Sequence, residues 1–308
     1  MRIVRGLASY RADTRPTAVA LGVFDGVHLA HRAILGAAVA GARAADIGAV
    51  ACTFDRHPAE ILQPDRAPAP ITTLEERLGL IAETGVEATI VLAFTRELAA
   101  VEPEAFVKDI LLTRLHAREI VVGFNHRFGH RARGDARLLE TLAEGLGFQA
   151  HVVPPLEIDG VPVSSTEIRA ALQRGDVRRA AAFLGRPYAI AGSVAAGAGR
   201  GRTLGFPTAN IAPDRQVLVP TGVYLGRVSV DGRPRPAVVN VGVRPTFGET
   251  TLAIEAHLLN FSGDLYGRPV RLEFIDRLRD EMRFGSVDEL KAQIERDIAA
   301  VREMRTSG

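Results

Sequence analysis

The stretch TAVALGVF at residues 17–24 decides the fold of the first half of the chain, together with the segment that follows it. TAVALGVF is short and apolar, as a buried strand is, and it ends in the turn Asp25–Gly26. The next segment, HLAHRAILGAAVAGARAA at residues 28–45, carries Ala, Leu and Ile at helical spacing. The pattern predicts a strand, a tight turn and a helix.

Three more apolar runs repeat this rhythm, each preceded by a helical pattern: AVACTFD (49–55), ATIVLAF (88–94) and REIVVGF (118–124). Strands that alternate with helices predict an α/β domain with a parallel sheet whose faces are both covered. In such a sheet, ligands bind outside the carboxyl ends of the strands, which is where the turn at Asp25 and Gly26 falls.

After about residue 186 the pattern changes to short strands separated by Gly, Pro, Asp and Asn, with no helix expected between them. The strands are YAIAGSV (188–194), GVYLGRVSV (222–230), PAVVNVGV (236–243), TLAIEAHLLN (251–260) and PVRLEFI (269–275). They predict an antiparallel β-barrel. A last helix follows, with a capping box at Ser286 and Glu289 and an apolar stripe of Val287, Leu290, Ile294, Ile298 and Val301. We therefore predict two domains, residues 1–186 and 187–308.

Composition excludes several classes of protein. With 308 residues, 47% of them hydrophobic and 24% charged, the chain has the composition of a globular protein of two ordinary domains, not that of a disordered or collagen-like chain. Its only lysines, Lys108 and Lys291, do not follow the glycine pattern of a Walker A loop, so a P-loop nucleotide site is excluded.

Charge and cysteine content favour a cytoplasmic protein that binds neither nucleic acid nor membrane. The net charge of +2 is too small and dispersed for a dedicated nucleic-acid binder. The single cysteine, Cys52, leaves no disulfide within the chain, and no signal peptide and no run of about 18 apolar residues is apparent.

The first motif with a chemical signature runs from Gly22 to His31. A helix that begins directly after a strand presents unpaired N–H groups and the positive end of its dipole to an anion. His28 and His31 are three residues apart in the first turn, so both imidazoles point to the same anion and stabilise charge on a leaving pyrophosphate. The alternatives are a surface pair or half of a zinc site, with Cys52 or His57 as the further ligand.

The second motif is SSTEIR at residues 164–169. Ser164 and Glu167 satisfy a capping box, so an ordinary helix start is one interpretation. The other is an anion site made by the hydroxyls of Ser164, Ser165 and Thr166 with Arg169 at a helix N-terminus. Two helix N-termini that face each other would hold a triphosphate from both sides.

The third motif lies in GAGRGRTLGFPTAN at residues 197–210. A dinucleotide fingerprint starting at Gly197 and Gly199 is rejected, because Arg202 takes the place of the third glycine and no helix is expected after it. What remains is a glycine- and arginine-rich loop before Thr208 and Asn210, two hard oxygen ligands suited to Mg²⁺ with a nucleotide phosphate. The alternative is an ordinary turn.

Glu255 is the fourth candidate. In TLAIEAHLL, alternation places Glu255 and His257 on the strand face opposite Leu252, Ile254, Ala256 and Leu258. A carboxylate on a barrel strand is either solvated or, if its face looks toward residues 207–210, a general base for an alcohol that attacks a γ-phosphate.

In their order and spacing, these segments resemble the bacterial bifunctional riboflavin kinase and FMN adenylyltransferase family, also called FAD synthetase, over nearly the whole chain. The resemblance rests on GVFDGVHLAH, TFDRHP (53–58), VGFNHRFG (122–129), SSTEIR, GRTLGFPTAN, VGVRPTFG (241–248), IEAHLLNFSGDLYG (254–267) and LRDEMRFGSVDEL. It departs from the family pattern at Ala30, Arg56, His126 and Asn260, none of which is a proposed catalytic group.

The resemblance implies a Rossmann-like nucleotidyltransferase domain that transfers AMP from ATP to FMN, and a riboflavin kinase barrel that phosphorylates riboflavin with MgATP. FMN and FAD are the products. The positions matched in the first domain are Gly22, Phe24, Asp25, Gly26, His28, His31, Asn125, Ser164, Ser165, Thr166 and Arg169. Those in the barrel are Gly205, Phe206, Pro207, Thr208 and Asn210, the last two also toward Mg²⁺, with Glu255 as the catalytic base.

Two other functions are open from the sequence. One is a nucleotidyltransferase for another phosphorylated metabolite, with the barrel as a flavin-binding module. The other is a barrel that binds oligonucleotides, although aromatic residues on which bases stack make up only 6% of the chain. The sequence does not determine the oligomeric state.

Overall fold

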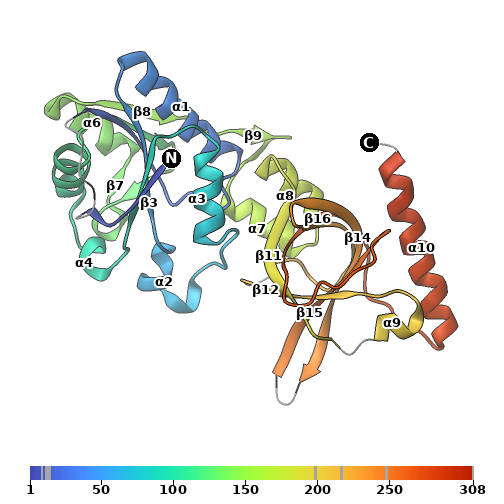
Figure 1. Cartoon of the computed structure of the whole chain (residues 1–308). Coiled ribbons are helices and arrows are strands. Elements are labelled where there is room, and N and C mark those ends of the chain that lie inside the picture. Colours follow the sequence, from blue (N-terminus) through green and yellow to red (C-terminus); the bar gives the residue numbers. More distant parts are fainter. Residues whose placement is uncertain (8–9, 11–14, 198–199, 216–217, 247–248, 307–308) are drawn as a thin grey trace. The chain divides into compact units, whose positions relative to one another are not determined.

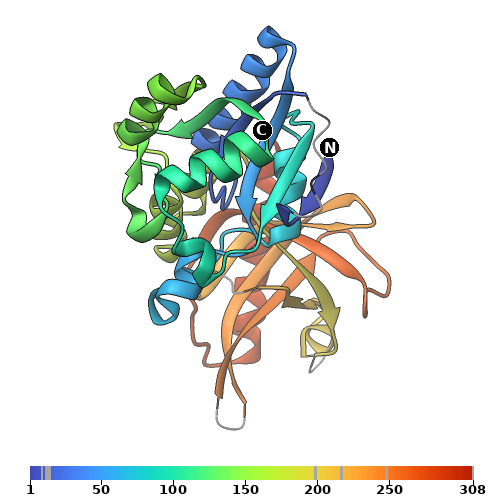
Figure 2. The same ribbon diagram turned by 90° about the vertical axis from the view of Figure 1, so that its left-hand side faces the viewer.

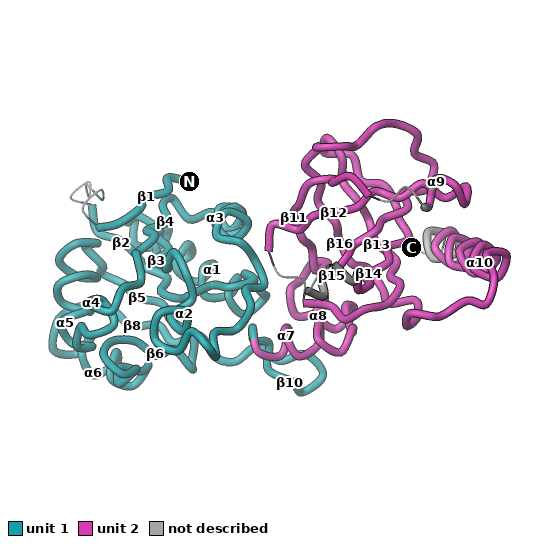
Figure 3. Tube along the Cα trace, turned by 90° about the horizontal axis from the view of Figure 1, so that it is seen from below, with its two compact units in different colours: residues 1–165 teal, residues 166–308 magenta. Residues whose placement is uncertain are grey.

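The computed structural model describes residues 1–7, 10, 15–197, 200–215, 218–246 and 249–306. Contacts within the chain divide it into two compact units, Met1–Ser165 and Thr166–Gly308 (Figure 3). This division precedes position 186 because α8 (Val177–Leu184) packs on strands of the second unit, β11 (Tyr188–Ala195) and β16 (Pro269–Arg279). The assignment of residues 166–186 to the first functional domain stays a prediction.

A parallel sheet of six strands forms the centre of the first unit, in the order β1-β4-β3-β2-β5-β8 (Figure 1). The strands are β1 (Arg2–Arg5), β2 (Thr17–Leu21), β3 (Gly48–Phe54), β4 (Ala88–Leu92), β5 (Ala117–Gly123) and β8 (Gln149–Val153). The four predicted strands are confirmed as β2, β3, β4 and β5. The edge strands β1 and β8 were not predicted, because both are largely exposed and lack a long apolar run.

Helices cover both faces of this sheet. The helices are α1 (Leu29–Ala45), α2 (Pro58–Leu62), α3 (Leu74–Ala82), α4 (Arg96–Ala99), α5 (Pro103–Ala105), a π-helix (Phe106–Arg114) and α6 (Ala136–Leu146). On one face Leu35 of α1 and Ile81 of α3 pack with Ala20 of β2. On the other, Val107 of the π-helix and Leu139 of α6 belong to the same cluster as Val19 and Val50. Burial on both faces explains why the strands read as continuous apolar runs.

The strand order sets where a ligand binds in this unit. The chain leaves β2 for β3 on one side, whereas β5 lies on the other side of β2, so the carboxyl ends of β2 and β5 form the topological switch point. The loop from β2 to α1 and the residues after β5 both begin at this point. Two short hairpins complete the unit, β6 (Arg127–Phe128) with β7 (Gly134–Asp135), and β9 (Glu157–Ile158) with β10 (Val161–Pro162).

The second unit contains the closed antiparallel barrel that the sequence predicts, in the order β11-β12-β15-β14-β13-β16. Besides β11 and β16 its strands are β12 (Ala209–Pro213), β13 (Gly222–Val230), β14 (Arg233–Thr246) and β15 (Glu249–Leu258). The hairpin of β14 and β15 extends beyond the body of the barrel (Figure 2). Helices α7 (Ser165–Gln173) and α8 precede the barrel, and α10 (Val287–Thr306) follows it.

The expectation that no helix interrupts the barrel strands was wrong at one place. A short helix, α9 (Arg200–Leu204), lies between β11 and β12. The N–H of Phe206 donates to the carbonyl of Gly201 at 2.8 Å, and Gly205 has φ of +90°, which together are the C-terminal cap of a Schellman motif. Gly199, part of the rejected fingerprint, and residues 247–248 of the segment VGVRPTFG lie outside the described residues.

The last helix has the predicted cap at Ser286, but the second bond of the predicted capping box reaches Gly285 instead of Ser286. Ser286 Oγ accepts a hydrogen bond from the Glu289 N–H at 3.2 Å, while the Glu289 carboxylate accepts from the N–H of Gly285. Val287 is 56% exposed, so the buried stripe begins at Leu290 and deepens toward Val301. Across the described part of the chain, no helix has both the length and the apolar character that crossing a membrane requires.

Candidate functional site

The loop from β2 to α1 is folded tightly at the switch point. A Cβ atom on Gly22 would come within 2.8 Å of the Phe24 ring, which folds back into the core and is fully buried. Gly26 has φ of +80°, and a Cβ there would press on the Ile71 side chain. These two glycines let the backbone turn sharply enough to start α1 directly beyond the sheet edge.

The Asp25 side chain holds this loop in place. Its carboxylate, 5% exposed, accepts hydrogen bonds from the backbone N–H groups of Ile71 and Thr72 and from the Thr72 hydroxyl, all at 3.0–3.1 Å. The Thr72 hydroxyl in turn accepts from the N–H of Gly26. The Asp25 side chain is therefore committed to holding the loop, and a direct part of Asp25 in nucleotide binding stays a prediction.

His28 and His31 lie together at the start of α1. Their rings stack with centroids 3.5 Å apart, and His31 also meets the Phe24 ring edge to face. His28 is the N-cap residue: its Nδ1 accepts from the His31 N–H at 3.2 Å, so in the neutral ring Nε2 carries the proton. His28 is only 4% exposed, which excludes the interpretation of a surface pair.

The protonation state of His31 follows from its surroundings. Burial, and then the charges of His28 and Arg77, hold the pKa of His31 well below its usual value of 6.5. At neutral pH the ring is an uncharged donor, placed beside the positive end of the α1 dipole. Among the described residues, no group of three His, Cys, Asp or Glu side chains is arranged to hold a metal ion, and Cys52 is buried in the sheet.

Arg77 is a functional candidate that the sequence analysis missed. It lies on α3, is 5% exposed, and donates to the carbonyls of Val23 at 2.9 Å and Phe54 at 2.6 Å. Burial lowers its pKa, against the opposing charges of Asp25 and Asp55, and the guanidinium stays a cation. Arg77 thus connects the β2–α1 loop with the end of β3, and its positive charge lies beside both segments.

The start of the SSTEIR segment reaches the same loop. α7 begins at Ser165, whose hydroxyl donates to the backbone carbonyl of Asp25 at 3.0 Å. The first residue of the second helix therefore lies beside the turn that leads into α1, and the shared anion site stays a prediction. Thr166 and Arg169 belong to the second unit, and their part in that site stays a prediction.

The residues after β5 complete the switch point. Phe124 is 48% exposed and the N–H of His126 donates to the carbonyl of Gly123, which makes a turn around the exposed Asn125. The Asn125 amide oxygen would lie 3.6 Å from a Cβ on Gly123. His126 points the other way, with its ring stacked on Phe128.

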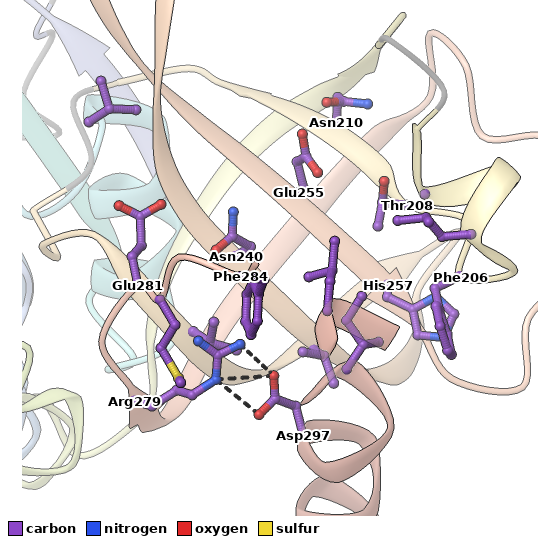
Figure 4. Close-up of a pocket in the computed structure, with 18 residues that line it drawn as sticks. Phe206, Thr208, Asn210, Asn240, Glu255, His257, Arg279, Glu281, Phe284 and Asp297 are labelled. Atoms are coloured by element: carbon purple, nitrogen blue, oxygen red, sulfur yellow. Dashed lines mark hydrogen bonds and ion pairs between the residues drawn. The ribbon is translucent and has the colours of Figure 1, made fainter. Parts of the chain in front are cut away.

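The second site is a cavity of about 600 Å³ in the barrel unit (Figure 4). Four candidates from the sequence line it: Phe206, Thr208, Asn210 and Glu255. The strand register pairs Asn210 of β12 with Glu255 of β15, and pairs Glu255 with Asn240 of β14. A hydroxyl, two amides and a carboxylate thus meet on one wall, and Asn240 is an addition that the sequence analysis missed.

The cavity lining combines polar and charged side chains with apolar ones. The apolar lining includes Val223, Val238, Met282, Phe284, Leu290 and Ile294. Arg279 of β16 donates hydrogen bonds of 2.8 to 3.2 Å to the Asp297 carboxylate of α10, and Gln293 donates to the same carboxylate. These bonds hold α10 against the barrel, where it forms one side of the cavity. Such a cavity suits a flat apolar ring system that carries a hydroxylated tail.

Thr208 reaches the cavity through the segment that precedes it, residues 205–207. Gly205 caps α9, and Phe206 lines the cavity with its ring edge to face against His257. Gly201 lies so close that a Cβ on it would come within 3.0 Å of Thr208 Oγ1. Signals for the missed residues were weak: Asn240 is the one polar residue in AVVNVGV, whereas Arg77 and Asp297 read as solvated charges on helices.

Comparison with known proteins assigns both units. A family model described as FAD synthetase matches residues 10–167, and one described as riboflavin kinase matches residues 184–305. The bifunctional riboflavin kinase/FMN adenylyltransferase of Escherichia coli strain K12 is 38% identical, and covers 98% of this chain and 97% of its own. The protein of the same name from Pseudomonas fluorescens is 39% identical, with coverages of 99% and 98%.

A solved structure agrees over the same length. The crystal structure of a macrolide-efflux protein from Streptococcus pneumoniae matches with a TM-score of 0.90 at 30% identity, covering 98% of this chain and 99% of its own. Because the two family models follow one another along the chain and the curated relatives extend over nearly all of it, the chain belongs to the family of bifunctional riboflavin kinase/FMN adenylyltransferases.

Proposed function

We propose that this chain phosphorylates riboflavin to FMN in the barrel cavity and transfers AMP from ATP to FMN at the switch point of the parallel sheet. The observation that carries the first step is that Thr208, Asn210 and Glu255 line one cavity together with several apolar side chains. The observation behind the second is the hydrogen bond from Ser165 to Asp25, beside the two histidines.

In the kinase step, the ribityl 5′-hydroxyl attacks the γ-phosphorus of ATP. Glu255 accepts the hydroxyl proton, the new P–O bond forms, and the bond to the β-phosphate oxygen breaks to release ADP. Asn210 and Asn240 are the residues paired with Glu255 on either side of it in the sheet, and their amides would orient its carboxylate. The apolar side chains of the cavity lining would contact the flavin ring and exclude water.

Thr208 and Asn210 would hold Mg²⁺ in this step. Their side chains are hard oxygen donors of the kind that Mg²⁺ accepts, and a magnesium site of this type takes its other ligands from water and substrate phosphates. When bound, the ion neutralises phosphate charge. The chain's own groups orient the phosphates and receive the proton.

In the adenylyl step, a phosphate oxygen of FMN attacks the α-phosphorus of ATP and pyrophosphate leaves. The nucleophile is already an anion, so no base is required. The α1 N-terminus, His28 and the uncharged donor His31 stabilise the charge that develops on the pyrophosphate, and Ser164, Ser165, Thr166 and Arg169 would bind it from the other side. Asn125, in the exposed turn after β5, would contact the flavin phosphate. ATP consumption and the single buried thiol fit a cytoplasmic enzyme.

The experiment separates the two steps with one isosteric change. The purified chain, given riboflavin, ATP and MgCl₂, should yield FMN and then FAD by chromatography, and a chelator should stop both until Mg²⁺ is restored. Glu255→Gln removes the proton acceptor and should lower FMN formation by about 100-fold or more. Conversion of added FMN to FAD should stay within about twofold of the parent chain, because that site is in the other unit.

Two results would count against the proposal. Loss of both steps in Glu255→Gln would contradict the division of labour between the units. FMN without FAD from the parent chain would reduce the protein to a kinase. Competition between flavin and other phosphorylated metabolites tests the alternative nucleotidyltransferase, which the match to both family models does not favour.

A further inference from the structure

His257 lines the barrel cavity and contacts the segment that carries Thr208. It projects from β15, two residues after Glu255, and its Nδ1 is 2.8 Å from the backbone carbonyl oxygen of Pro207. Its ring meets Phe206 edge to face, with the centroids 5.9 Å apart (Figure 4). One half-buried side chain thus touches the two residues that directly precede Thr208.

The hydrogen bond fixes which nitrogen carries the proton. A backbone carbonyl only accepts, so Nδ1 must be the donor. In the neutral ring this leaves Nε2 unprotonated, on the opposite side from Pro207. The atom that acts on the segment is therefore Nδ1, and a substitute side chain has to present its donor at the same place.

The strand pairing shows why a side chain is needed here. The register between β12 and β15 runs from Ile211 opposite Ile254 to Ala209 opposite Ala256, and it ends there. The next position would pair Thr208 with His257, but β12 begins only at Ala209, and Pro207 has no N–H to give to a ladder. The His257 side chain therefore connects β15 with Pro207, just beyond the last backbone pair of Ala209 and Ala256.

We propose that His257 is a positioning residue for phosphoryl transfer, which holds the Pro207 carbonyl through Nδ1–H and thereby fixes the Thr208 hydroxyl relative to Glu255. This inference rests on the proposed kinase function. Without the bond, Pro207 and Thr208 would be held only by α9 before them and by the ladder that starts at Ala209. A displacement of about 1 Å at such a site is enough to cost up to about 100-fold in rate.

Three substitutions at one position test the inference. His257→Asn places its amide nitrogen where Nδ1 lies, His257→Gln places it near Nε2, and His257→Phe keeps the ring contact with Phe206 without a donor. For each we would measure kcat and the KM values for MgATP and riboflavin, the Mg²⁺ concentration at half-maximal rate, riboflavin binding by fluorescence quenching, and adenylylation of added FMN.

We expect His257→Phe and His257→Gln to lower kcat/KM for MgATP by about 10- to 100-fold and to require more Mg²⁺. His257→Asn should recover to within about threefold of the parent chain. Riboflavin binding and FMN adenylylation should change less than twofold in all three, which shows that the barrel and the other unit are folded.

The contrary outcomes are distinct. Full activity in His257→Phe, or rescue by Gln but not by Asn, would overturn the positioning role of Nδ1. Equal loss in all three variants with folding intact would make His257 itself a group that reacts. A parent chain that forms no FMN would instead overturn the proposed kinase function, and this inference with it.

Discussion

At the scale of single residues, His126 has the most unusual environment among the groups outside the proposed chemistry. The ring stacks on Phe128, and its Nε2 atom is buried without a hydrogen-bond partner. Burial lowers the pKa of His126 to about 4, because the protonated ring would lose its hydration. The resemblance to the family places an aromatic side chain at this position, and a neutral imidazole packs as one.

This environment predicts acid sensitivity. The unfolded chain binds a proton at His126 below pH 6.5, whereas the folded chain resists protonation until about pH 4, so the free energy of unfolding falls with pH across that window. Between pH 7 and 5 the loss should be about 2 kcal/mol from this residue. His126→Phe should remove that loss, as measured by urea unfolding at the two pH values. His31, also held neutral, contributes with the same sign.

The matched control is Phe128→Leu, which disturbs the same ring stack but removes no titratable group. It should lower stability by a similar amount at both pH values. If His126→Phe instead loses as much stability in acid as the parent chain, the ring is already protonated in the fold and the burial argument is wrong.

At the scale of elements, α1 carries two glycines in different surroundings. Gly36 is exposed, and a Cβ on it would meet nothing within 4 Å. Gly41 faces β5, where a Cβ would collide with the Glu119 carboxylate. Glu119 is 8% exposed, and its Oε2 atom has no hydrogen-bond partner but lies 3.5 Å from His151 Nε2. The helix can approach the sheet here only because residue 41 has no side chain.

The two alanine substitutions should therefore have opposite signs. Gly36→Ala gains helix propensity and should raise the free energy of unfolding by about 0.5–1 kcal/mol. Gly41→Ala gains the same propensity but must displace a buried carboxylate, and it should lower stability by about 1–3 kcal/mol. Urea unfolding of both variants under one condition measures the difference. Equal stabilisation would mean that Glu119 turns away at no cost.

At the scale of the whole molecule, the proposed function places two successive reactions in two units of one chain. The product of the barrel site is the substrate of the switch-point site. Nothing in the chemistry of either step requires FMN to stay bound between them, because each site takes its own ATP.

A mixing experiment tests whether FMN passes through solution. Glu255→Gln alone should leave riboflavin unconverted, and His28→Ala alone should stop at FMN. An equimolar mixture of the two variants should produce FAD from riboflavin after a lag, since free FMN from one chain reaches the other. A mixture that accumulates FMN without FAD, while Glu255→Gln still converts added FMN, would mean that the product is not released.

Much of this architecture was predictable from local patterns. The spacing of apolar residues was enough to predict the α/β character of the first unit and its four central strands. It was also enough to predict the antiparallel barrel and the final helix. Local patterns failed where burial is slight, as at the edge strands β1 and β8, or where a helix is shorter than two turns, as at α9. In each failure the segment was too short or too exposed for periodicity to show.

The sequence by itself determined which side chains were candidates, because glycines, histidines and hydroxyls at helix starts have the same chemistry in any fold. Only the tertiary structure decided which side chains and backbone groups meet, and it added Asn240: Ser165 lies with Asp25, Asn240 with Glu255, and His257 with Pro207. The tertiary structure also showed that Arg77, which reads in the sequence as a solvated charge on a helix, is buried and hydrogen-bonded to two backbone carbonyls. The physical reason is that strand order and register set contacts between distant residues, and no local pattern encodes them.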